Sequence, residues 1–342
     1  MRHDAGTDTA GPARDGAPRL SGAPAPGAPR RNPDTASRGA APPVVAAVVV
    51  RAEDAPGPTL VVELGQLPDG ALALREELGA LRRALAGTPY ARLNKFALYG
   101  SSTRPGRDLD YRFVQALPDG GFDFRTGCGH SLLACVVAYG RRGPVTVHAV
   151  TTGDLVRCTP EAASGAYSLR FLRPPDTPGT LPTGRPVDVL GGLPVSLVRY
   201  GNPYAFVDAA HLGIRSAEGL FRAGDSTLRR LLALRAHAAR VLGHAPHSAL
   251  PKIAAFTAGP GGLAVRALTV GGWHPRLALT GAAALAAAAA LPGTVVPALD
   301  GPVHTPGGPV AVSADDHGVA VHRKRATVLD RVELPWRIHA TA

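Results

Sequence analysis

The sequence is poor in cysteine and in aromatic residues. Its three cysteines, Cys128, Cys135 and Cys158, form no Cys-x-x-Cys pair. A low, odd number of cysteines argues against a disulfide framework and is typical of a reducing compartment. Aromatic residues make up only 5% of the 342-residue chain, so valine, leucine and alanine must supply most of the core.

Segments that direct a protein to a membrane are also missing. The N-terminus has no apolar stretch of the kind found in a secretory signal. The longest apolar run, "LTGAAALAAAAALPG" at residues 279–293, is too short and too rich in alanine to span a bilayer. We therefore expect a cytoplasmic protein that makes no contact with a membrane.

Lysine is scarce although positive charge is abundant. The formal net charge is +11, yet only Lys95, Lys252 and Lys324 are lysines among 37 basic residues. A basic chain can bind nucleic acid. The basic residues are scattered, however, and no zinc-finger, RNP or basic-helix pattern occurs. We predict no nucleic-acid partner, and an anionic small molecule is at least as good a use for the charge.

The pattern along the chain predicts a tail followed by two α/β halves. Residues 1–42 contain hardly any large apolar residue and are expected to be disordered. Strand-like and helix-like segments then alternate. We predict a first domain over 43–183 and a second over 184–325, with 326–342 returning as a strand toward the first.

Two helices in these halves are apolar on every side and should be buried on every side. The first follows Thr126-Gly127-Cys128, and the second follows Thr280-Gly281-Ala282. Two blocks of similar size, each a sheet around a buried helix, suggest an internal duplication. Two unrelated core helices that both begin after Thr-Gly are the alternative, and the spacing alone does not decide between them.

Cys128 stands between two glycines at the predicted start of the first buried helix. The start of a helix carries unpaired N–H groups and a positive dipole end, which favour anions and lower the pKa of a thiol. Gly127 and Gly129 would let a ligand approach the backbone closely. Cys128 is therefore a candidate catalytic thiol beside a carboxylate-binding loop. The alternative is a small buried residue without a chemical role.

Lys95 opens the predicted strand "NKFALYG". Arginine cannot give up its proton, whereas a desolvated lysine can and so can act as an acid or a base. In a chain that places arginine almost everywhere else, Lys95 is thus a candidate proton-transfer group. The alternative is a lysine at a strand end whose amine reaches solvent. Lys252 occupies a similar position, which weakens the case for either residue.

The order of these motifs resembles the PrpF-type isomerases, which include 2-methylaconitate cis–trans isomerase and oxalomesaconate tautomerase. The resemblance covers most of residues 44–335 and rests on the segments "NKFALYGSSTRPGRDLDYRFVQ", "GCGHSLLA", "VHAVTTGDLV", "LPTGRPVDVLGGLPVSLVRYGNPYAFVDAAHLGI", "WHPRLALTGAAALAAAAALPGTVV" and "VHTPGGPVAV". It implies the diaminopimelate epimerase-like fold: α/β, with two pseudo-repeated domains, each a mixed β-sheet wrapped around a buried central helix, and the site in the cleft between them.

The resemblance also implies a reaction and the residues that perform it. PrpF-type enzymes use one cysteine and one lysine, which match Cys128 and Lys95, and they need no cofactor or metal. The implied reaction moves a proton within an unsaturated di- or tricarboxylate. Epimerases of this fold use a second cysteine, but here that position is read as Ala282, so a two-thiol racemase is not expected.

The remaining candidates are substrate-binding residues. Gly129, His130 and Ser131 are expected to hold one carboxylate, and Ser101, Ser102 and Arg104 another, although Arg104 is equally well read as a solvated turn residue. Weaker candidates from the second domain are Asn202, Thr280 and His304. The histidines are not spaced as metal ligands. A small carboxylate substrate is the expected partner, and a homodimer is left open.

Several loops depart from the family pattern. "VRAEDAPGP" stands where a Gly-Gly-Thr-Ser loop should follow the first strand, and Gly127 and His130 replace two asparagines beside the cysteine. These parts hold the substrate, so we expect a substrate other than methylaconitate, from a specialised pathway. A non-catalytic accessory protein that binds a ligand or a partner enzyme is the alternative. The changed loops favour that alternative, whereas the retained Cys-Lys pair opposes it.

Overall fold

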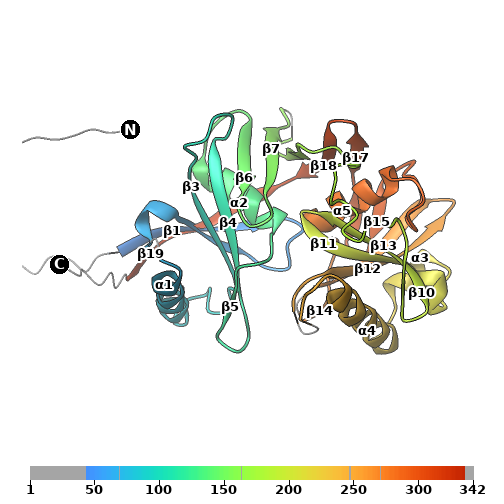
Figure 1. Cartoon of the computed structure of the whole chain (residues 1–342). Coiled ribbons are helices and arrows are strands. Elements are labelled where there is room, and N and C mark those ends of the chain that lie inside the picture. Colours follow the sequence, from blue (N-terminus) through green and yellow to red (C-terminus); the bar gives the residue numbers. More distant parts are fainter. Residues whose placement is uncertain (1–43, 69, 163, 246–247, 270, 336–342) are drawn as a thin grey trace, which may run out of the picture. The chain divides into compact units, whose positions relative to one another are not determined.

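The computed structural model describes residues 44–335 apart from residues 69, 163, 246, 247 and 270. The predicted tail over 1–42 lies outside the described residues. Two mixed β-sheets hold the strands of the described part (Figure 1). The α/β class expected from the sequence, with two mixed β-sheets, is confirmed.

The first sheet has the order β17-β18-β8-β7-β6-β4-β3-β2-β1-β19, with β5 beside β4. Its strands are β1 (Val44–Ala52), β2 (Thr59–Glu63), β3 (Lys95–Ser101), β4 (Leu109–Ala116), β5 (Phe122–Asp123), β6 (Val145–Ala149), β7 (Asp154–Pro160), β8 (Tyr167–Phe171), β17 (Val312–Asp315), β18 (Gly318–Lys324) and β19 (Ala326–Pro335). The second sheet has the order β16-β15-β13-β12-β11-β10-β9, with β14 beside β13. Its strands are β9 (Asp188–Leu190), β10 (Leu193–Tyr200), β11 (Asn202–Asp208), β12 (Lys252–Gly259), β13 (Gly262–Thr269), β14 (Gly272–Trp273), β15 (Val303–Thr305) and β16 (Gly308–Val310).

The last strands of the chain return to the first sheet. β19 pairs with β1, and β18 pairs with β8. The predicted boundary at residue 325 had placed β17 and β18 with the second half. Alternation of apolar and polar residues identifies a strand there, but it carries no information about which sheet edge the strand joins.

The two halves repeat one pairing pattern. In the first half β1–β2 is antiparallel, β2–β3 parallel, β3–β4 and β4–β5 antiparallel, β4–β6 parallel and β6–β7 antiparallel. In the second half β10–β11, β11–β12, β12–β13, β13–β14, β13–β15 and β15–β16 follow the same series. Six matching pairings in the same chain order favour the internal duplication over two unrelated core helices.

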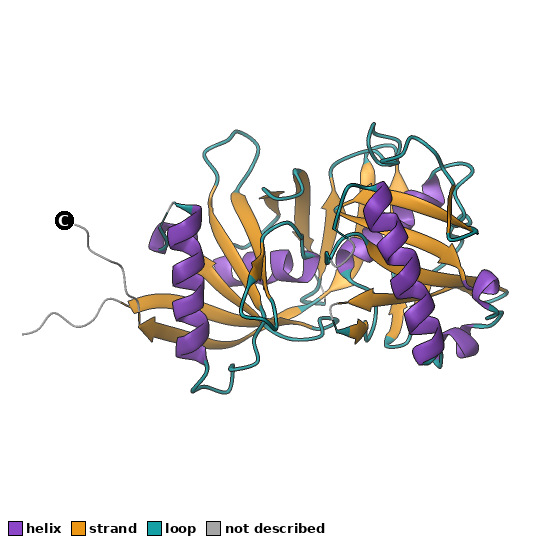
Figure 2. Cartoon of the chain, turned by 60° about the horizontal axis from the view of Figure 1, so that its bottom comes forward, coloured by secondary structure: helices purple, strands orange, loops and turns teal. Residues whose placement is uncertain are grey.

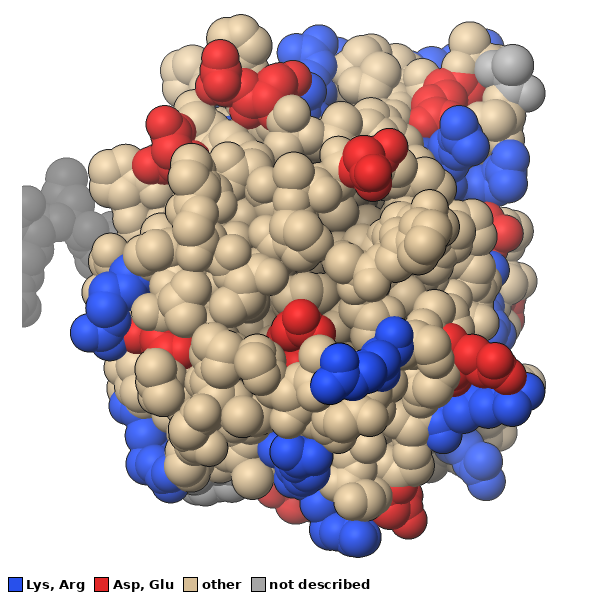
Figure 3. Space-filling model, turned by 90° about the vertical axis from the view of Figure 1, so that its right-hand side faces the viewer, with Lys and Arg blue, Asp and Glu red and all other residues tan. Residues whose placement is uncertain are grey.

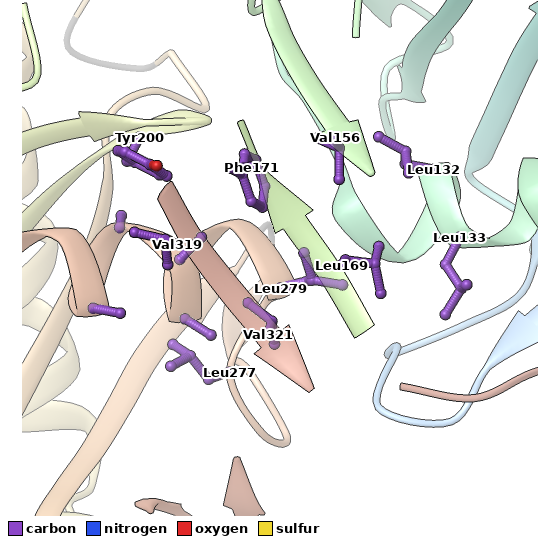
Figure 4. Close-up of a cluster of buried hydrophobic side chains, with 14 of the residues drawn as sticks. Leu132, Leu133, Val156, Leu169, Phe171, Tyr200, Leu277, Leu279, Val319 and Val321 are labelled. Carbon is purple, nitrogen blue, oxygen red and sulfur yellow. The ribbon is translucent and has the colours of Figure 1, made fainter. Parts of the chain in front are cut away.

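Each sheet packs a buried helix on one face and an amphipathic helix on the other. The helices are α1 (Ala71–Leu85), α2 (Gly129–Tyr139), α3 (Ala217–Phe221), α4 (Asp225–Val241) and α5 (Leu279–Ala290). Apolar residues of α2 and α5 share one core with side chains of both sheets, part of which appears in Figure 4. On the other faces, α1 packs on the first sheet and α4 on the second (Figure 2).

Strand β3 shows how the sequence places these layers. Phe96 and Leu98 contribute to the core beneath α1, whereas Ala97 between them contributes to the core around α2. Side chains of a strand alternate between the two faces of its sheet, so a strand covered on both faces is apolar throughout. Helix α1 places Leu74, Leu78, Leu81 and Leu85 along one side, at the spacing of an amphipathic helix.

Charges on one face of the molecule are mixed rather than gathered (Figure 3). On the face drawn in Figure 3, acidic and basic side chains are interspersed around a broad area that carries neither. A nucleic-acid site needs a basic patch or stripe, and this face has none among the described residues. None of the described helices has the length and apolar character needed to cross a membrane.

Candidate active site

The starts of the two buried helices meet at one small cavity. Its volume is about 60 Å³, and residues of α2, α5, β3, β4, β11, β12 and β13 line it. The lining includes four basic side chains: Lys95, Lys252, His130 and His274. The described lining residues include no aspartate or glutamate. The cavity is therefore suited to an anion.

Cys128 is the N-cap residue of α2, with an extended backbone (φ −144°, ψ 107°), and it lines the cavity. The N-cap residue of α5 is Ala278, which lines the same cavity. The structural counterpart of Cys128 is thus Ala278, and our assignment of Ala282 was wrong. Ala282 lies one turn further along α5 and is fully buried. The assignment failed because Thr280-Gly281 lies inside α5, whereas Thr126-Gly127 lies before α2, so matching the two Thr-Gly pairs shifts the alignment by one helical turn. The second half still has no thiol at this position.

The two helix starts approach each other closely. A Cβ atom built on Gly129, the first residue of α2, would lie 2.8 Å from Cβ of Leu279, the first residue of α5. Only glycine fits at that point. The first N–H groups of a helix have no acceptor within the helix, so both helices direct unpaired donors and positive dipole ends toward this region.

Asn202 holds the backbone just before Cys128. Its Oδ1 accepts from the Gly127 N–H at 2.7 Å, and its Nδ2 donates to the Gly127 carbonyl at 2.8 Å. The Tyr111 hydroxyl donates to the Cys128 carbonyl at 2.8 Å. Asn202 begins β11 in the second half, so this clamp fixes the cysteine loop of the first half against the second.

Lys95 is buried, with 6% of its surface exposed. Its Nζ donates to the Gly57 carbonyl at 3.3 Å, and it has no ion pair among the described residues. Burial lowers the pKa of Lys95, an effect that nearby Cys128 opposes and Arg51 reinforces. A larger fraction of neutral amine is therefore present near neutral pH than for a lysine in solvent.

The two imidazoles are stacked, with 6.3 Å between the ring centroids of His130 and His274. Burial, reinforced by Lys95, lowers the pKa of His130 well below its usual value and that of His274 to about 4. Both rings are thus neutral near pH 7. His130 Nε2 and Thr126 Oγ1 are buried without a hydrogen-bond partner. Such atoms at a cavity wall are available to a polar ligand.

Six of the predicted residues meet at this cavity: Lys95, Cys128, Gly129, His130, Asn202 and Thr280. Five do not line it: Ser101, Ser102, Arg104, Ser131 and His304. The Ser131 hydroxyl bonds that of Thr59 at 2.9 Å inside the core, and His304 Nε2 bonds the Gly261 carbonyl at 2.8 Å.

The Ser101–Arg104 turn is separated from the cavity by the length of a strand. Lys95 begins β3 and Ser101 ends it, so the turn lies roughly 20 Å away along the sheet. Ser102 Oγ accepts from the Arg104 N–H within that exposed turn. The resemblance of this segment to the family suggested a shared site, but the two ends of an extended strand lie at opposite ends of the sheet.

Sequence reasoning did not select Lys252, His274 and Gln115, which also line the cavity. Lys252 had a usable signal, because two of the three lysines of the chain begin equivalent strands. His274 and Gln115 stand in two of the family-like segments, but neither was selected from them, and only the fold brings the two residues beside Cys128. Among the described residues, no group of three or more His, Cys, Asp or Glu side chains is placed to hold a metal ion.

Comparison with known proteins agrees with the diaminopimelate epimerase-like fold expected from the sequence. The family model described as PrpF protein matches residues 142–325. An oxalomesaconate Δ-isomerase of Novosphingobium sp. is 27% identical over 59% of the chain, and a 3-methylitaconate isomerase of Eubacterium barkeri is 28% identical over 36% of it. These matches span only 66% and 42% of those two relatives. A crystal structure of a methylitaconate Δ-isomerase superposes with a TM-score of 0.62 at 22% identity, over 86% of this chain and 96% of that one.

Proposed function

The chain belongs to the PrpF family, and we propose that it is a cofactor-independent isomerase that moves a proton within an unsaturated di- or tricarboxylate. The observation that carries the proposal is the joint placement of Cys128 and Lys95 on one cavity without acidic lining residues. The names of the two relatives, an oxalomesaconate and a methylitaconate isomerase, indicate the same substrate class.

In this proposal one carboxylate of the substrate binds at the starts of α2 and α5. Unpaired N–H groups of both helices, the Thr280 hydroxyl and His130 Nε2 are the available donors. When the neighbouring carbon loses a proton, negative charge spreads onto that carboxylate as an enediolate. Fixed donors stabilise the enediolate more strongly than the bound carboxylate from which it forms. This difference lowers the activation free energy of proton removal.

Proton transfer is assigned to Cys128 and Lys95. One of the two, as base, takes the proton from the carbon beside the carboxylate, and the double bond shifts by one position. The other, in its protonated form, gives a proton to the far carbon of the allylic system. The substrate gains and loses one proton, and exchange with solvent restores the two enzyme groups. The lowered pKa of Lys95 suits a group that must change its protonation state during turnover.

This chemistry requires a reduced thiol at Cys128. Such a requirement fits a reducing compartment, and we retain the cytoplasm as the proposed location. The buried Cys135 and Cys158 have no part in the mechanism. Burial raises the pKa of both thiols, which keeps them protonated.

Proton NMR in deuterated water tests the proposal. Aconitate, itaconate and mesaconate analogues are incubated with the protein, and deuterium incorporation at allylic carbons is followed. We expect exchange with at least one acid, and a loss of about 1,000-fold in its rate in Cys128→Ala, as for removal of an acid–base group.

Cys158→Ala is the matched control, because it removes a thiol outside the cavity and should leave the exchange rate unchanged. Tight binding of an acid without any exchange in the wild-type protein would contradict the isomerase. That result would support the accessory role instead.

A further inference from the structure

Lys252 occupies in the second half the position that Lys95 occupies in the first. Each is the first residue of a strand that lies between one parallel and one antiparallel neighbour: β3 between β2 and β4, and β12 between β11 and β13. Both lysines line the cavity that contains Cys128. The duplication has thus placed a second amine at the site, although only one half has a thiol.

The side chain of Lys252 has no partner in the described part of the chain, where it makes neither a hydrogen bond nor an ion pair. Its acidic neighbour, Asp123, is held by Arg125 through the backbone N–H at 2.8 Å and Nε at 3.4 Å. Lys324, by contrast, forms a buried ion pair with Asp54. Because a desolvated ammonium group is costly without a counter-charge, the position of Lys252 suits an anion that is supplied from outside.

Lys252 also stands where two cavities join. A larger cavity of about 570 Å³ lies beside the inner one and shares with it Ala249, Lys252, Leu268 and Thr269. The inner cavity, at about 60 Å³, is far below the ~300 Å³ typical of the smallest ligand pockets. A substrate that reaches Cys128 and is larger than the inner cavity has room to extend past Lys252 into the larger one.

We propose that Lys252 binds a second carboxylate of the substrate and acts as a specificity-determining residue without taking part in proton transfer. This inference rests on the proposed function and narrows it. It assigns the places where two carboxylates of the proposed di- or tricarboxylate bind: one at the starts of α2 and α5, and another at the junction of the two cavities.

The charge state of Lys252 agrees with this role. Burial, reinforced by Arg235, lowers its pKa to about 8, while Asp123 and Cys128 act in the opposite direction. At pH 7 the ammonium form still predominates, and a bound carboxylate would stabilise it further.

Steady-state kinetics of Lys252→Met test the proposal with matched substrates. One is the dicarboxylate turned over by the wild-type protein, and the other is its monomethyl ester, blocked at the carboxylate far from the reacting carbon. For the dicarboxylate we expect KM to rise about 10- to 100-fold with kcat nearly unchanged, as for loss of a hydrogen bond between charged groups. For the ester we expect KM to change by less than about threefold, because the anion that Lys252 binds is already missing. Lys252→Arg, which keeps the charge, should restore most of the affinity.

A large fall in kcat for both substrates would overturn the proposal, since it would mean that Lys252 moves a proton. An unchanged KM for the dicarboxylate would overturn it as well. The control variant is Arg229→Met, which removes one exposed positive charge from α4 outside both cavities and should change neither constant.

Calorimetric binding of a saturated dicarboxylate, methylsuccinate, separates this inference from the proposed function, because it requires no turnover. We expect the affinity to fall about 10- to 100-fold in Lys252→Met and to be unchanged in Arg229→Met. That result in a protein without isomerase activity would support the anion site and reject the isomerase. Equal affinity of the wild-type protein and Lys252→Met, or no binding to either, would reject the anion site.

Discussion

The two halves of this protein share a fold but differ at the start of their central helices. In the first half Cys128 caps α2 and Lys95 begins β3, whereas in the second Ala278 caps α5 and Lys252 begins β12. The amine is present twice and the thiol once. The difference indicates a division of roles, in which the first half performs the proton transfer and the second holds the substrate.

The two lysines also differ in their partners and in the cavities beside them. Lys95 is buried and bonds a backbone carbonyl, so a neutral amine is tolerated there. Lys252 has no hydrogen-bond partner among the described residues and lies beside the larger cavity, and with a pKa lowered by burial to about 8 it is still mostly an ammonium group at pH 7. Because burial lowers the pKa of both lysines, the proposed roles of base for Lys95 and fixed cation for Lys252 rest on their partners and on the cavities beside them.

The largest effect is expected for Lys95→Arg, which keeps a positive charge and removes the ability to lose a proton. Turnover should fall roughly 100-fold, as for loss of a general acid or base, while methylsuccinate binding changes little. Stopped assays of isomerisation together with calorimetry measure both quantities. Near-normal turnover would indicate that Lys95 only attracts anions and that the two lysines have the same role.

A smaller effect, on stability, is expected where the two halves touch. Gly129→Ala would place a Cβ atom 2.8 Å from Leu279 Cβ and force the helix starts apart. We expect the free energy of unfolding in urea to fall by about 1–3 kcal/mol, as in other overpacked cores. Gly79→Ala in α1 is the control: its new Cβ meets nothing closer than 3.4 Å, and it should stabilise by about 0.5–1 kcal/mol. Equal effects of the two substitutions would show that the helix starts are not tightly packed.

The smallest effect concerns acid pH. The pKa of His274 in the folded protein is about 4, below the ~6.5 of an unfolded chain, so the unfolded state binds more protons below pH 6.5. Stability from this residue is therefore present above pH 6.5 and is lost as the pH falls toward 4. Urea unfolding should show a loss between pH 7 and pH 5.5 that is smaller by roughly 1 kcal/mol in His274→Gln, where His130, whose pKa is also lowered, still contributes. The control is His211→Gln, at an exposed histidine, which should show the same loss as the wild-type protein. A loss of wild-type size in His274→Gln would contradict the lowered pKa of His274.

The sequence predicted the architecture well, because apolar periodicity reports directly on burial. The all-apolar stretches at α2 and α5 are buried, and the alternation in β3 matches its two covered faces. Periodicity could not align the two halves to the residue, so the counterpart of Cys128 was assigned one helical turn too late. It also could not show that β17 and β18 join the first sheet, since the edge that a strand pairs with depends on tertiary contacts.

Only part of the candidate site could be predicted, because tertiary contacts bring the rest of it together. Cys128, Gly129 and His130 were found because the chemistry of a helix start can be recognised in a short segment. Ser101, Ser102 and Arg104 were taken from the family-like turn that follows the Lys95 strand, and β3 carries that turn to the other end of the sheet. His274 and Lys252 come from distant segments that only the repeated fold brings to the cavity.

Deuterium incorporation at saturating substrate is the most direct test of the division of roles. The rate at the allylic carbon is measured by NMR in deuterated water for the wild-type protein, Lys95→Arg and Lys252→Met. If the first half transfers the proton and the second holds the substrate, Lys252→Met retains the wild-type rate once the substrate is saturating. Under the same conditions Lys95→Arg loses about 100-fold. A loss of that size in Lys252→Met, with Lys95→Arg near the wild-type rate, would contradict the account.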